Sequence, residues 1–570
     1  MPQTLQNAKT RRAAAALLGA AAGIAVFLLV FGTAPLALSF DGWILNGYDE
    51  ADVQQHYAGW LLFRNSRWAF PLGLCGTLAW PDGTVIAYTD SVPWVSIGLK
   101  LLRGILPGTF QWFGWYVLAC FALQGAAGGL LTARVGCLPF AALGAGLFCM
   151  MPALWERAFR HVALTSHYLI LFALYTLLEY RAALRTAGAG AAPPRYPWQF
   201  ALLGFAAIGI HPYFLPPVLL CALLGAVDCA RYARRPARGA LGLAASLAAT
   251  LAGGFLSGVL GGGVTASRYG YGDFSMNLNA PFNPSSRGGY AWSRLLPVLP
   301  QQPAQYDGFN YLGLGLLALL ALALAASAVG LLSPAGRRRA GDWWRRNGFL
   351  TGGCALLTLF AVSNKVYWGA AGFTVPLPDA VLQFCGVFRA SGRMFWLPAC
   401  CAVLYSLYAL WRFCAAKPRA AVWACAVLCA GLALQGWDLS AAAAQKRAKF
   451  SAPVDATVVT DAQTADLGAG HRYLLAASAL REDRVRLLAI LAGKNGLATN
   501  LSIAVSGRYP NAGRSMGDAA ALLETGRYDP QAVYVTTDGG QYERWQRLFA
   551  EDPQVRLFVA SSCYFLVPAG

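Results

Sequence analysis

Long apolar stretches separated by short polar connections dominate the chain up to about residue 440. A helix that crosses the hydrocarbon core of a membrane needs roughly 20 mostly apolar residues. About eleven stretches meet this requirement, near 13–38, 109–133, 137–154, 164–180, 196–211, 213–230, 239–263, 309–332, 348–364, 394–412 and 420–437. The fifth and sixth meet at GIHPYFLPP and are also consistent with one broken helix. The pattern predicts an α-helical multi-pass membrane protein.

The pattern changes from about residue 441 onward. Short runs typical of strands, HRYLLAAS, AVYVTTD, VRLFVAS and CYFLVPAG, alternate there with the helical patterns REDRVRLLAILAGKNG and GGQYERWQRLFAED. No glycine motif for phosphate binding stands out in this tail. We therefore predict a transmembrane domain over 1–440 and a small α/β domain over 441–570, whose composition favours a lid or docking module.

Composition agrees with the membrane pattern. Hydrophobic residues make up 57% of the 570 residues and charged residues only 12%, which is too apolar for a soluble protein with ordinary surfaces. Much of the formal net charge of +19 lies in every second connection, for example at Arg11, Arg134 and Arg231. Such cations stay on the cytoplasmic side, so they predict a cytoplasmic N-terminus and an external C-terminal domain. The positive charge therefore indicates the membrane topology, and we do not expect a nucleic-acid partner.

The first apolar stretch fits both a signal peptide and a retained helix, because KTRR precedes it. Its apolar run exceeds the roughly 7–15 residues of a signal-peptide core. The length therefore favours a retained helix.

The fourteen cysteines are mostly placed inside apolar stretches, where they act as small apolar side chains. No CxxC or CxxH spacing accompanies the cysteines predicted outside the membrane. The sequence therefore predicts no structural zinc and no disulfide framework, and it supports no metal or other cofactor.

Charged and aromatic residues gather in the predicted external connections. A transporter would be expected to keep ionisable residues within its spans, where they mark ion or proton paths, and the apolar stretches contain almost none. This distribution is typical of an enzyme that works at the membrane surface.

The first external connection carries the sequence GYDEADVQQHYAGWLLFRNSRW, residues 47–68. In a helix, Asp52 and His56 lie one turn apart on the same face, with Asp49 a turn before and Trp60 a turn after; Glu50 is a further nearby carboxylate. One face then offers a proton acceptor, a partner that orients it, and an aromatic wall. The alternative is an interfacial amphipathic helix whose aromatic residues anchor it and whose acids face water.

A second group, WPDGTVIAYTDSVPW, contributes two aspartates. Asp82 stands in a PDG turn signal. Asp90 is a candidate for substrate binding, and its position ahead of Ser91 and Pro93 equally fits a helix N-cap.

A third group, WERAFRHVALTSHY, places five ionisable residues at a predicted membrane edge, namely Glu156, Arg157, Arg160, His161 and His167. Arginine binds phosphate oxygens bidentately, so the group is able to hold a phosphate beside a carboxylate. The alternative is that these side chains extend toward lipid headgroups.

A fourth group comes from the later external connections and supplies Tyr306, Asp307, Asn310, Arg389 and Arg393. Aromatic faces with amides and acids suit sugar rings, and the two arginines precede a span, at the depth of lipid phosphates. The alternative is an ordered loop packed on the helices.

These motifs carry a resemblance. The order of many spans, a first external loop with an acidic–aromatic motif and a soluble C-terminal domain resembles the GT-C superfamily of integral-membrane glycosyltransferases. More closely, DVQQHYAGWLLFR, YTDSVPW, RHVALTSHYLI, QYDGFNYLGLG and FRASGRMFW resemble a bacterial domain-of-unknown-function family of multi-pass proteins grouped with GT-C enzymes. The resemblance covers nearly the whole chain.

The resemblance implies an enzyme that takes a sugar from a polyprenyl-phosphate-type lipid donor and passes it, with inversion, to an extracytoplasmic glycan or lipid acceptor. The base maps best to Asp52, with Asp49 and Glu50 as neighbouring candidates and His56 as the residue that orients it. Arg157, Arg160, Arg389 or Arg393 would neutralise the departing phosphate. The implied location is the bacterial inner membrane, with a periplasmic C-terminal domain. Two alternatives remain open, a transporter or flippase for lipid-linked glycans and a noncatalytic partner in envelope polysaccharide assembly.

Overall fold

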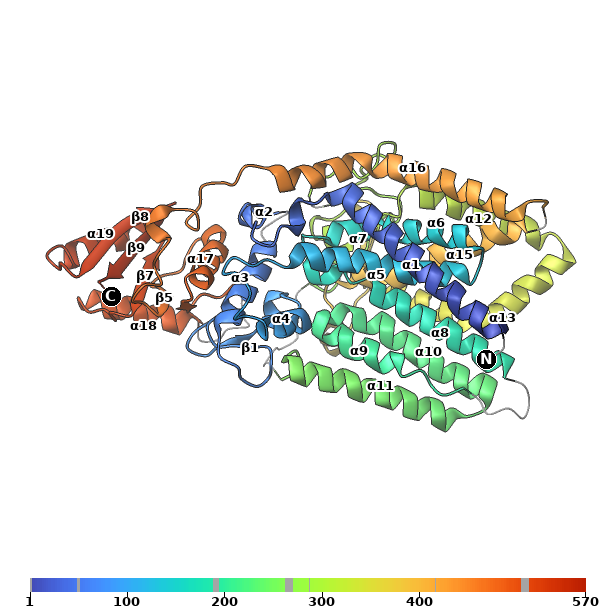
Figure 1. The fold of residues 1–570 in the computed structure, drawn as a ribbon, viewed down its shortest axis with the longest axis horizontal. Coiled ribbons are helices and arrows are strands. Elements are labelled where there is room, and N and C mark those ends of the chain that lie inside the picture. Colours follow the sequence, from blue (N-terminus) through green and yellow to red (C-terminus); the bar gives the residue numbers. More distant parts are fainter. Residues whose placement is uncertain are drawn as a thin grey trace.

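A computed structural model describes residues 3–48, 52–187, 194–261, 270–286, 288–415, 417–503 and 512–569. Within these residues the chain forms a bundle of long helices with an α/β domain at one end (Figure 1). A layer of short helices, short strands and loops lies between the bundle and this domain. We call the end of the bundle that faces the α/β domain the domain end.

The bundle is built from helices that follow the predicted apolar stretches. They are α1 (Gln3–Phe31), α5 (Phe113–Ala133), α6 (Leu138–Cys149), α8 (Tyr168–Thr186), α9 (Gln199–Ile210), α10 (Leu215–Ala233), α11 (Pro236–Ser257), α12 (Leu314–Leu331), α13 (Pro334–Val362), α15 (Trp396–Cys414) and α16 (Ala420–Ala448). Each predicted stretch corresponds to one of these helices, and the multi-pass helical fold is confirmed.

Fewer helices than the predicted eleven reach both the length and the hydropathy of a membrane span. Among the described residues, eight helices are long and apolar enough to cross a membrane. Helices α6 and α9 are apolar but have only 12 residues each. Helix α13 continues the predicted stretch 348–364 backward through five arginines, which lowers its hydropathy. The break at GIHPYFLPP separates α9 from α10, so these are two helices.

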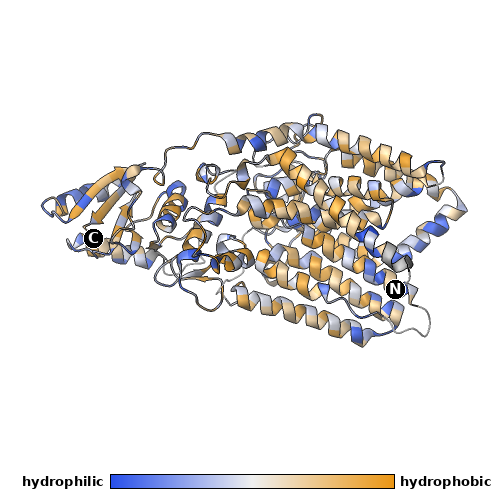
Figure 2. Cartoon of the chain, in the orientation of Figure 1, coloured by the Kyte–Doolittle hydropathy of each residue, from blue (hydrophilic) through white to orange (hydrophobic). Residues whose placement is uncertain are grey.

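The basic connections share the end of the bundle that carries the N-terminus. Figure 1 shows the N-terminus, the α10–α11 connection and the start of α13 at the end opposite the α/β domain. Arg12 and Arg134 both pair there with Glu179. Figure 2 shows hydrophilic residues gathered at this end and apolar residues along the bundle. The fold therefore separates the arginine-rich end from the domain end.

The layer at the domain end contains short elements from several connections. Its helices are α2 (Gly42–Leu45), α3 (Asp52–Asn65), α4 (Pro93–Lys100), α7 (Pro152–Arg157) and α14 (Asp379–Gly386). Its strands form two antiparallel pairs, β1 (Leu74–Cys75) with β2 (Thr84–Val85) and β3 (Lys365–Trp368) with β4 (Ala371–Thr374). Single 3₁₀ turns add η2 (Ile86–Thr89), η3 (Val162–Thr165), η5 (Pro303–Gly308) and η6 (Ser391–Phe395).

The C-terminal α/β domain is a five-stranded sheet of order β6-β5-β7-β9-β8. Strand β5 is parallel to β6 and β7, whereas β9 is antiparallel to β7 and β8. The four predicted strands correspond to β5 (Tyr473–Ala476), β7 (Ala532–Thr536), β8 (Val555–Ala560) and β9 (Cys563–Pro568), and the two predicted helices to α17 (Glu482–Lys494) and α19 (Gly539–Leu548). Strand β6 (Ala498–Thr499) and helix α18 (Ala512–Glu524) complete it.

Helix α17 packs directly against α3, because Gly493 faces Leu61 without an intervening side chain. Asn65 donates a hydrogen bond to the Gly493 carbonyl over 2.8 Å, and Lys494 pairs with Asp41 at 2.7 Å. Residues 77–80 also pair with Thr499, the second residue of β6. One hydrophobic core consequently runs from the bundle through α3 into α17.

Candidate functional site

Helix α3 is the centre of the layer at the domain end. Asp52 is its first residue and is half-buried. Trp60 and Phe63 are fully buried and so do not anchor α3 at an interface, whereas Trp68 and Phe70, which follow α3, are exposed. Asp49 and Glu50, the other two candidate carboxylates, lie outside the described residues.

Gly59 allows the loop that carries Asp90 to approach α3. A Cβ atom at Gly59 would lie 2.2 Å from Thr89 Oγ1 and 2.4 Å from Ser91 Oγ, closer than any ordinary contact. Ser91 Oγ donates a hydrogen bond to the His56 carbonyl over 2.7 Å. The glycine and this hydrogen bond together bring Asp90 to the same turn of α3 as His56.

Three histidines surround Asp90. Asp90 Oδ2 lies 3.7 Å from His161 Nε2, and Asp90 Oδ1 lies 3.5 Å from His211 Nε2. The rings of His56 and His161 stack with centroids 5.3 Å apart. We call these four residues the histidine–aspartate cluster. Asp90 is not a helix N-cap: Val92 occupies that position of α4.

The proton on His211 is fixed by its neighbours. The Tyr213 backbone N–H donates to His211 Nδ1 over 3.2 Å, so in the neutral ring the proton lies on Nε2. That nitrogen faces Asp90 Oδ1. His211 therefore holds one carboxylate oxygen of Asp90 and leaves Oδ2 to face His161.

Burial controls the ionisation of this cluster. It lowers the pKa of His56 to about 4 and the pKa of His161 well below its ordinary value, so both rings are neutral at pH 7. Burial by itself would raise the pKa of Asp90, but His161 and His211 outweigh it and hold that pKa below its usual range. The cluster thus presents an ionised carboxylate among neutral imidazoles.

A buried ion triad lies beside this cluster. Arg157 binds Asp307 Oδ1 at 2.7 Å, and Arg393 Nη2 binds both carboxylate oxygens of Asp307 at 2.9 and 3.1 Å. The segments η5 and η6 that carry Asp307 and Arg393 touch through glycine: a Cβ at Gly392 would lie 2.5 Å from the Gly308 Cα. Two guanidinium groups therefore share one carboxylate.

The charge of Arg393 reaches the histidine–aspartate cluster. It lowers the pKa of His161, after burial and against the opposing effect of Asp90, and it also lowers the pKa of His211. In the other direction Arg393 and Arg157 hold the pKa of Asp307 below its usual range, although burial acts against them. The triad and the cluster are therefore neighbouring parts of one polar site.

A second ion pair joins α7 to the same region. Glu156 forms a close ion pair with Arg160, and Lys446 Nζ lies 4.0 Å from Glu156 Oε2 and 4.0 Å from the centre of the Tyr290 ring. The Arg160 guanidinium lies 5.7 Å from the Tyr306 ring centre. Glu156, Arg157 and Arg160 are buried, which is inconsistent with side chains that extend to lipid headgroups.

Three further candidates occupy different surroundings. His167 is buried against Trp396, with ring centroids 4.3 Å apart. Asn310 donates hydrogen bonds to the carbonyls of Gly308 and Gly392, both over 2.9 Å, so it ties η5 to η6. Arg389 is half-buried over the Phe274 ring, and within the described residues no carboxylate forms an ion pair with it.

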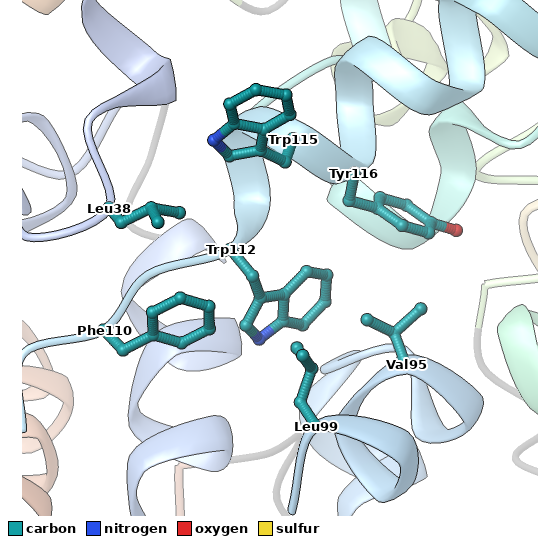
Figure 3. A pocket seen from close by; sticks show the side chains of 7 residues that line it. All are labelled: Leu38, Val95, Leu99, Phe110, Trp112, Trp115 and Tyr116. Carbon is teal, nitrogen blue, oxygen red and sulfur yellow. The ribbon is translucent and has the colours of Figure 1, made fainter. Parts of the chain in front are cut away.

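An apolar groove runs along α4 and the start of α5. It has a volume of about 360 Å³ and is lined by Leu38, Val95, Leu99, Phe110, Trp112, Trp115 and Tyr116. Figure 3 shows the Trp112 indole facing Leu99 and Val95 across the groove. Helix α4 begins three residues after Asp90, and the Tyr116 hydroxyl hydrogen-bonds Ser166, next to His167. The groove and the polar site therefore share the same supporting segments.

Sequence reasoning assigned no role to His211 or Lys446. His211 is one of only five histidines and sits at the break between two apolar helices, which is a signal for function because polar residues are costly at membrane depth. Lys446 lies at the end of α16, within the stretch assigned to the soluble domain, and nothing in its local sequence indicates burial.

The comparisons with known proteins add a family. No curated protein matches the chain. The profile of a domain of unknown function, DUF6311, matches residues 20–440, which covers every membrane helix except the first part of α1 and the end of α16. The matched region includes the whole polar site apart from Lys446. The chain therefore belongs to the DUF6311 family.

Proposed function

We propose that this protein is a membrane glycosyltransferase that transfers a sugar from a polyprenyl-phosphate-type lipid donor to an extracytoplasmic glycan or lipid acceptor. In this proposal it lies in the bacterial inner membrane with its domain end outward. The proposal combines the resemblance to GT-C enzymes with the residues gathered at the domain end.

The observation that carries the proposal is the apolar groove beside a polar site of opposite charges. A lipid-linked sugar has three parts with different needs: an isoprenoid chain, a phosphate and a sugar. The groove offers only apolar and aromatic walls to a chain, and Trp115 at its edge is 52% exposed, as expected of a side chain that faces lipid. Carboxylates, imidazoles and guanidinium groups lie beyond α4. One amphiphilic donor matches this arrangement.

Arg389 is the best candidate to bind the phosphate. Arg157 and Arg393 already bind Asp307, and Arg160 binds Glu156. Arg389 precedes η6 by two residues and pairs with no carboxylate of the described ranges. Its guanidinium is therefore available for the bidentate contacts that phosphate oxygens favour.

The reaction requires one proton acceptor and one anion stabiliser. An acceptor hydroxyl attacks the anomeric carbon, and the bond from that carbon to the phosphate oxygen breaks with inversion. The hydroxyl proton passes to a carboxylate, for which Asp52 is the candidate, and the phosphate keeps the bonding electrons. A positioned base contributes typically 10²–10⁴-fold to such a rate. The arginine stabilises the charge that develops on the leaving phosphate.

A transporter or flippase is the alternative function, and the distribution of buried charge argues against it. The polar site lies at the domain end, whereas the buried Arg181–Asp228 pair lies near the ends of α8 and α10, at the opposite end of the bundle. Each candidate span also contains an 18-residue apolar window with at most two charged residues. A polar path from end to end, as transport requires, is not supported within the described residues.

The test is sugar transfer by the purified full-length protein from radiolabelled polyprenyl-phosphate sugars to a cell-envelope glycan fraction. We expect transfer by the wild type and a loss of about 10²–10⁴-fold in kcat for Asp52→Asn. Asp82→Asn, which alters an exposed aspartate in a turn of the same loop, is the matched control and should retain full activity.

The outcomes separate the alternatives. Full activity of Asp52→Asn removes Asp52 as the base. Absence of transfer with every donor, together with movement of labelled lipid across proteoliposome membranes, contradicts the glycosyltransferase and supports the flippase. If neither transfer nor movement occurs while deletion of the gene abolishes an envelope glycan, the noncatalytic role is supported.

A further inference from the structure

The histidine–aspartate cluster has the composition and spacing of a metal site. Ligand atoms of His56, Asp90 and His161 all lie within 4.8 Å of one another. They come from three separate segments, namely α3, the end of η2 and the residue before η3. No sequence spacing reveals this arrangement, because the three residues are more than thirty positions apart along the chain.

His56 is the observation that points to a bound ion. Its side chain is fully buried, and neither ring nitrogen has a hydrogen-bond partner among the described residues. His161 Nδ1 is also buried without a partner in this part of the chain. Each buried polar atom left unsatisfied costs about 1–3 kcal/mol. Such a cost in a packed interior indicates that a bound group, such as a metal ion, accepts the lone pair of a ring nitrogen.

His211 completes the arrangement as the residue that orients the carboxylate. Its Nε2 lies 3.5 Å from Asp90 Oδ1, and this contact orients the carboxylate so that Oδ2 lies toward His161. Partners of this kind around metal ligands are typical of protein sites and raise their affinity. The Arg393 cation nearby is neutralised by Asp307, which limits its repulsion of a second cation.

We propose that His56, Asp90 and His161 bind one divalent transition-metal ion of the zinc type. Two imidazoles and one carboxylate are a ligand set that zinc uses in open sites, with a further position left for water or substrate. Zinc lies about 2.0–2.2 Å from such ligands, so the three side chains need to close by about 1 Å, which small χ rotations supply. The proposal stands independently of the glycosyltransferase function.

The site remains reachable from outside. The side chains of Asp90 and His161 are 26% and 15% exposed, whereas His56 is fully buried. An ion would thus rest against His56 at the bottom of the cluster and face solvent or substrate on the side of Asp90 and His161.

The experiment uses the purified full-length protein, stripped with a chelator, and titrates it with zinc chloride by calorimetry. We expect one zinc ion per chain. Asp90→Asn and His161→Gln should weaken binding by at least about 100-fold, and His211→Gln by about 10–100-fold, the range for partners of metal ligands. His471→Gln is the matched control, because His471 lies in the C-terminal domain between two carbonyl oxygens, and it should bind zinc like the wild type.

Cobalt chloride provides a second readout that does not depend on a variant's folding. The proposal predicts a weak visible spectrum from nitrogen and oxygen ligands in the wild type. No zinc binding by the wild type, equal binding by Asp90→Asn and His161→Gln, or an intense thiolate band from one of the fourteen cysteines would each overturn it. Size-exclusion and melting profiles identify any variant that fails to fold, in which case the wild-type cobalt spectrum decides.

Discussion

Substitutions in the Arg157–Asp307–Arg393 triad should have non-additive effects on stability. Removing a second member of the triad should restore part of the stability that is lost when Asp307 is replaced. Asp307→Asn keeps the shape of the side chain but leaves two buried guanidinium groups without their shared carboxylate. Removing one partner of a buried ion pair costs about 3–5 kcal/mol, because the remaining charge stays desolvated. We expect Asp307→Asn to lower the free energy of unfolding by that amount, which for a chain of 570 residues corresponds to about 3–4 °C in melting temperature.

The partner substitution should be milder. Arg393→Gln removes the hydrogen bonds to Asp307 but leaves the Arg157–Asp307 pair, at 2.7 Å, in place. Arg157 still neutralises Asp307, so no buried charge is left unpaired, and we expect a total loss below the Asp307→Asn range, about 1.5–3 kcal/mol. In the double variant only one guanidinium is left unpaired. It should therefore be about 1–2 kcal/mol more stable than Asp307→Asn alone, so the effects of the two substitutions should not add.

The assay is thermal unfolding of the four proteins in one detergent, followed by tryptophan fluorescence. The pKa of Asp307 is lowered in the folded protein by Arg393 and Arg157 in spite of burial. The stability from its ionised form is present above the pKa of an unfolded aspartate, about 4, and is lost as the pH falls through the folded-state pKa. The order of the variants should thus be the same from pH 5 to pH 8. A double variant less stable than Asp307→Asn would refute the shared-carboxylate argument.

Two further predictions concern residues that support the site. Gly59→Ala places a methyl group 2.2 Å from Thr89 Oγ1, and overpacking of this kind costs about 1–3 kcal/mol. Because the methyl group also displaces Asp90, the zinc affinity measured by calorimetry should fall at least tenfold. Unchanged affinity would show that the loop adapts freely. Lys100 is enclosed by Phe63, Trp68 and Ser66, and burial lowers its pKa to about 8. Between pH 8 and about 10 the unfolded chain holds this proton and the folded chain does not, so the melting temperature of the wild type should rise relative to Lys100→Met; parallel curves for the two proteins would contradict this.

The parts of the fold that follow from local periodicity were accessible from the sequence. Each apolar stretch corresponds to a helix, and the strands β5, β7, β8 and β9 lie within the predicted runs. Strand β6 has only two residues, too few to show an alternating pattern. Three of the eleven predicted stretches fall short of a candidate span: α6 and α9 end after 12 residues, at Cys149 and Ile210, and α13 contains five arginines.

The residues of the site were partly accessible, and their pairing was not. Loop composition indicated Asp90, His161, Asp307 and Arg393, but each partner lies far away along the chain, as with Asp307 and Arg393, which are 86 positions apart. Gly59 and Gly308 allow segments that are distant in the sequence to pack closely together. Contacts between such segments leave no periodic pattern in the sequence. The burial of α3 was likewise hidden, because its cover comes from α17, more than four hundred residues later.

The central claim is that the apolar groove and the polar site bind one anionic lipid donor. Photocrosslinking tests it most directly, with a polyprenyl phosphate that carries a photoreactive group in its isoprenoid chain and with labelled peptides identified by mass spectrometry. We predict labelling of Leu99, Trp112 and Tyr116 in the groove and competition by unlabelled polyprenyl phosphate. Labelling should be lost in Arg389→Gln but not in Arg345→Gln, which alters an exposed arginine of α13. Labelling spread over lipid-facing helices such as α12, unaffected by competitor or by Arg389→Gln, would contradict the claim.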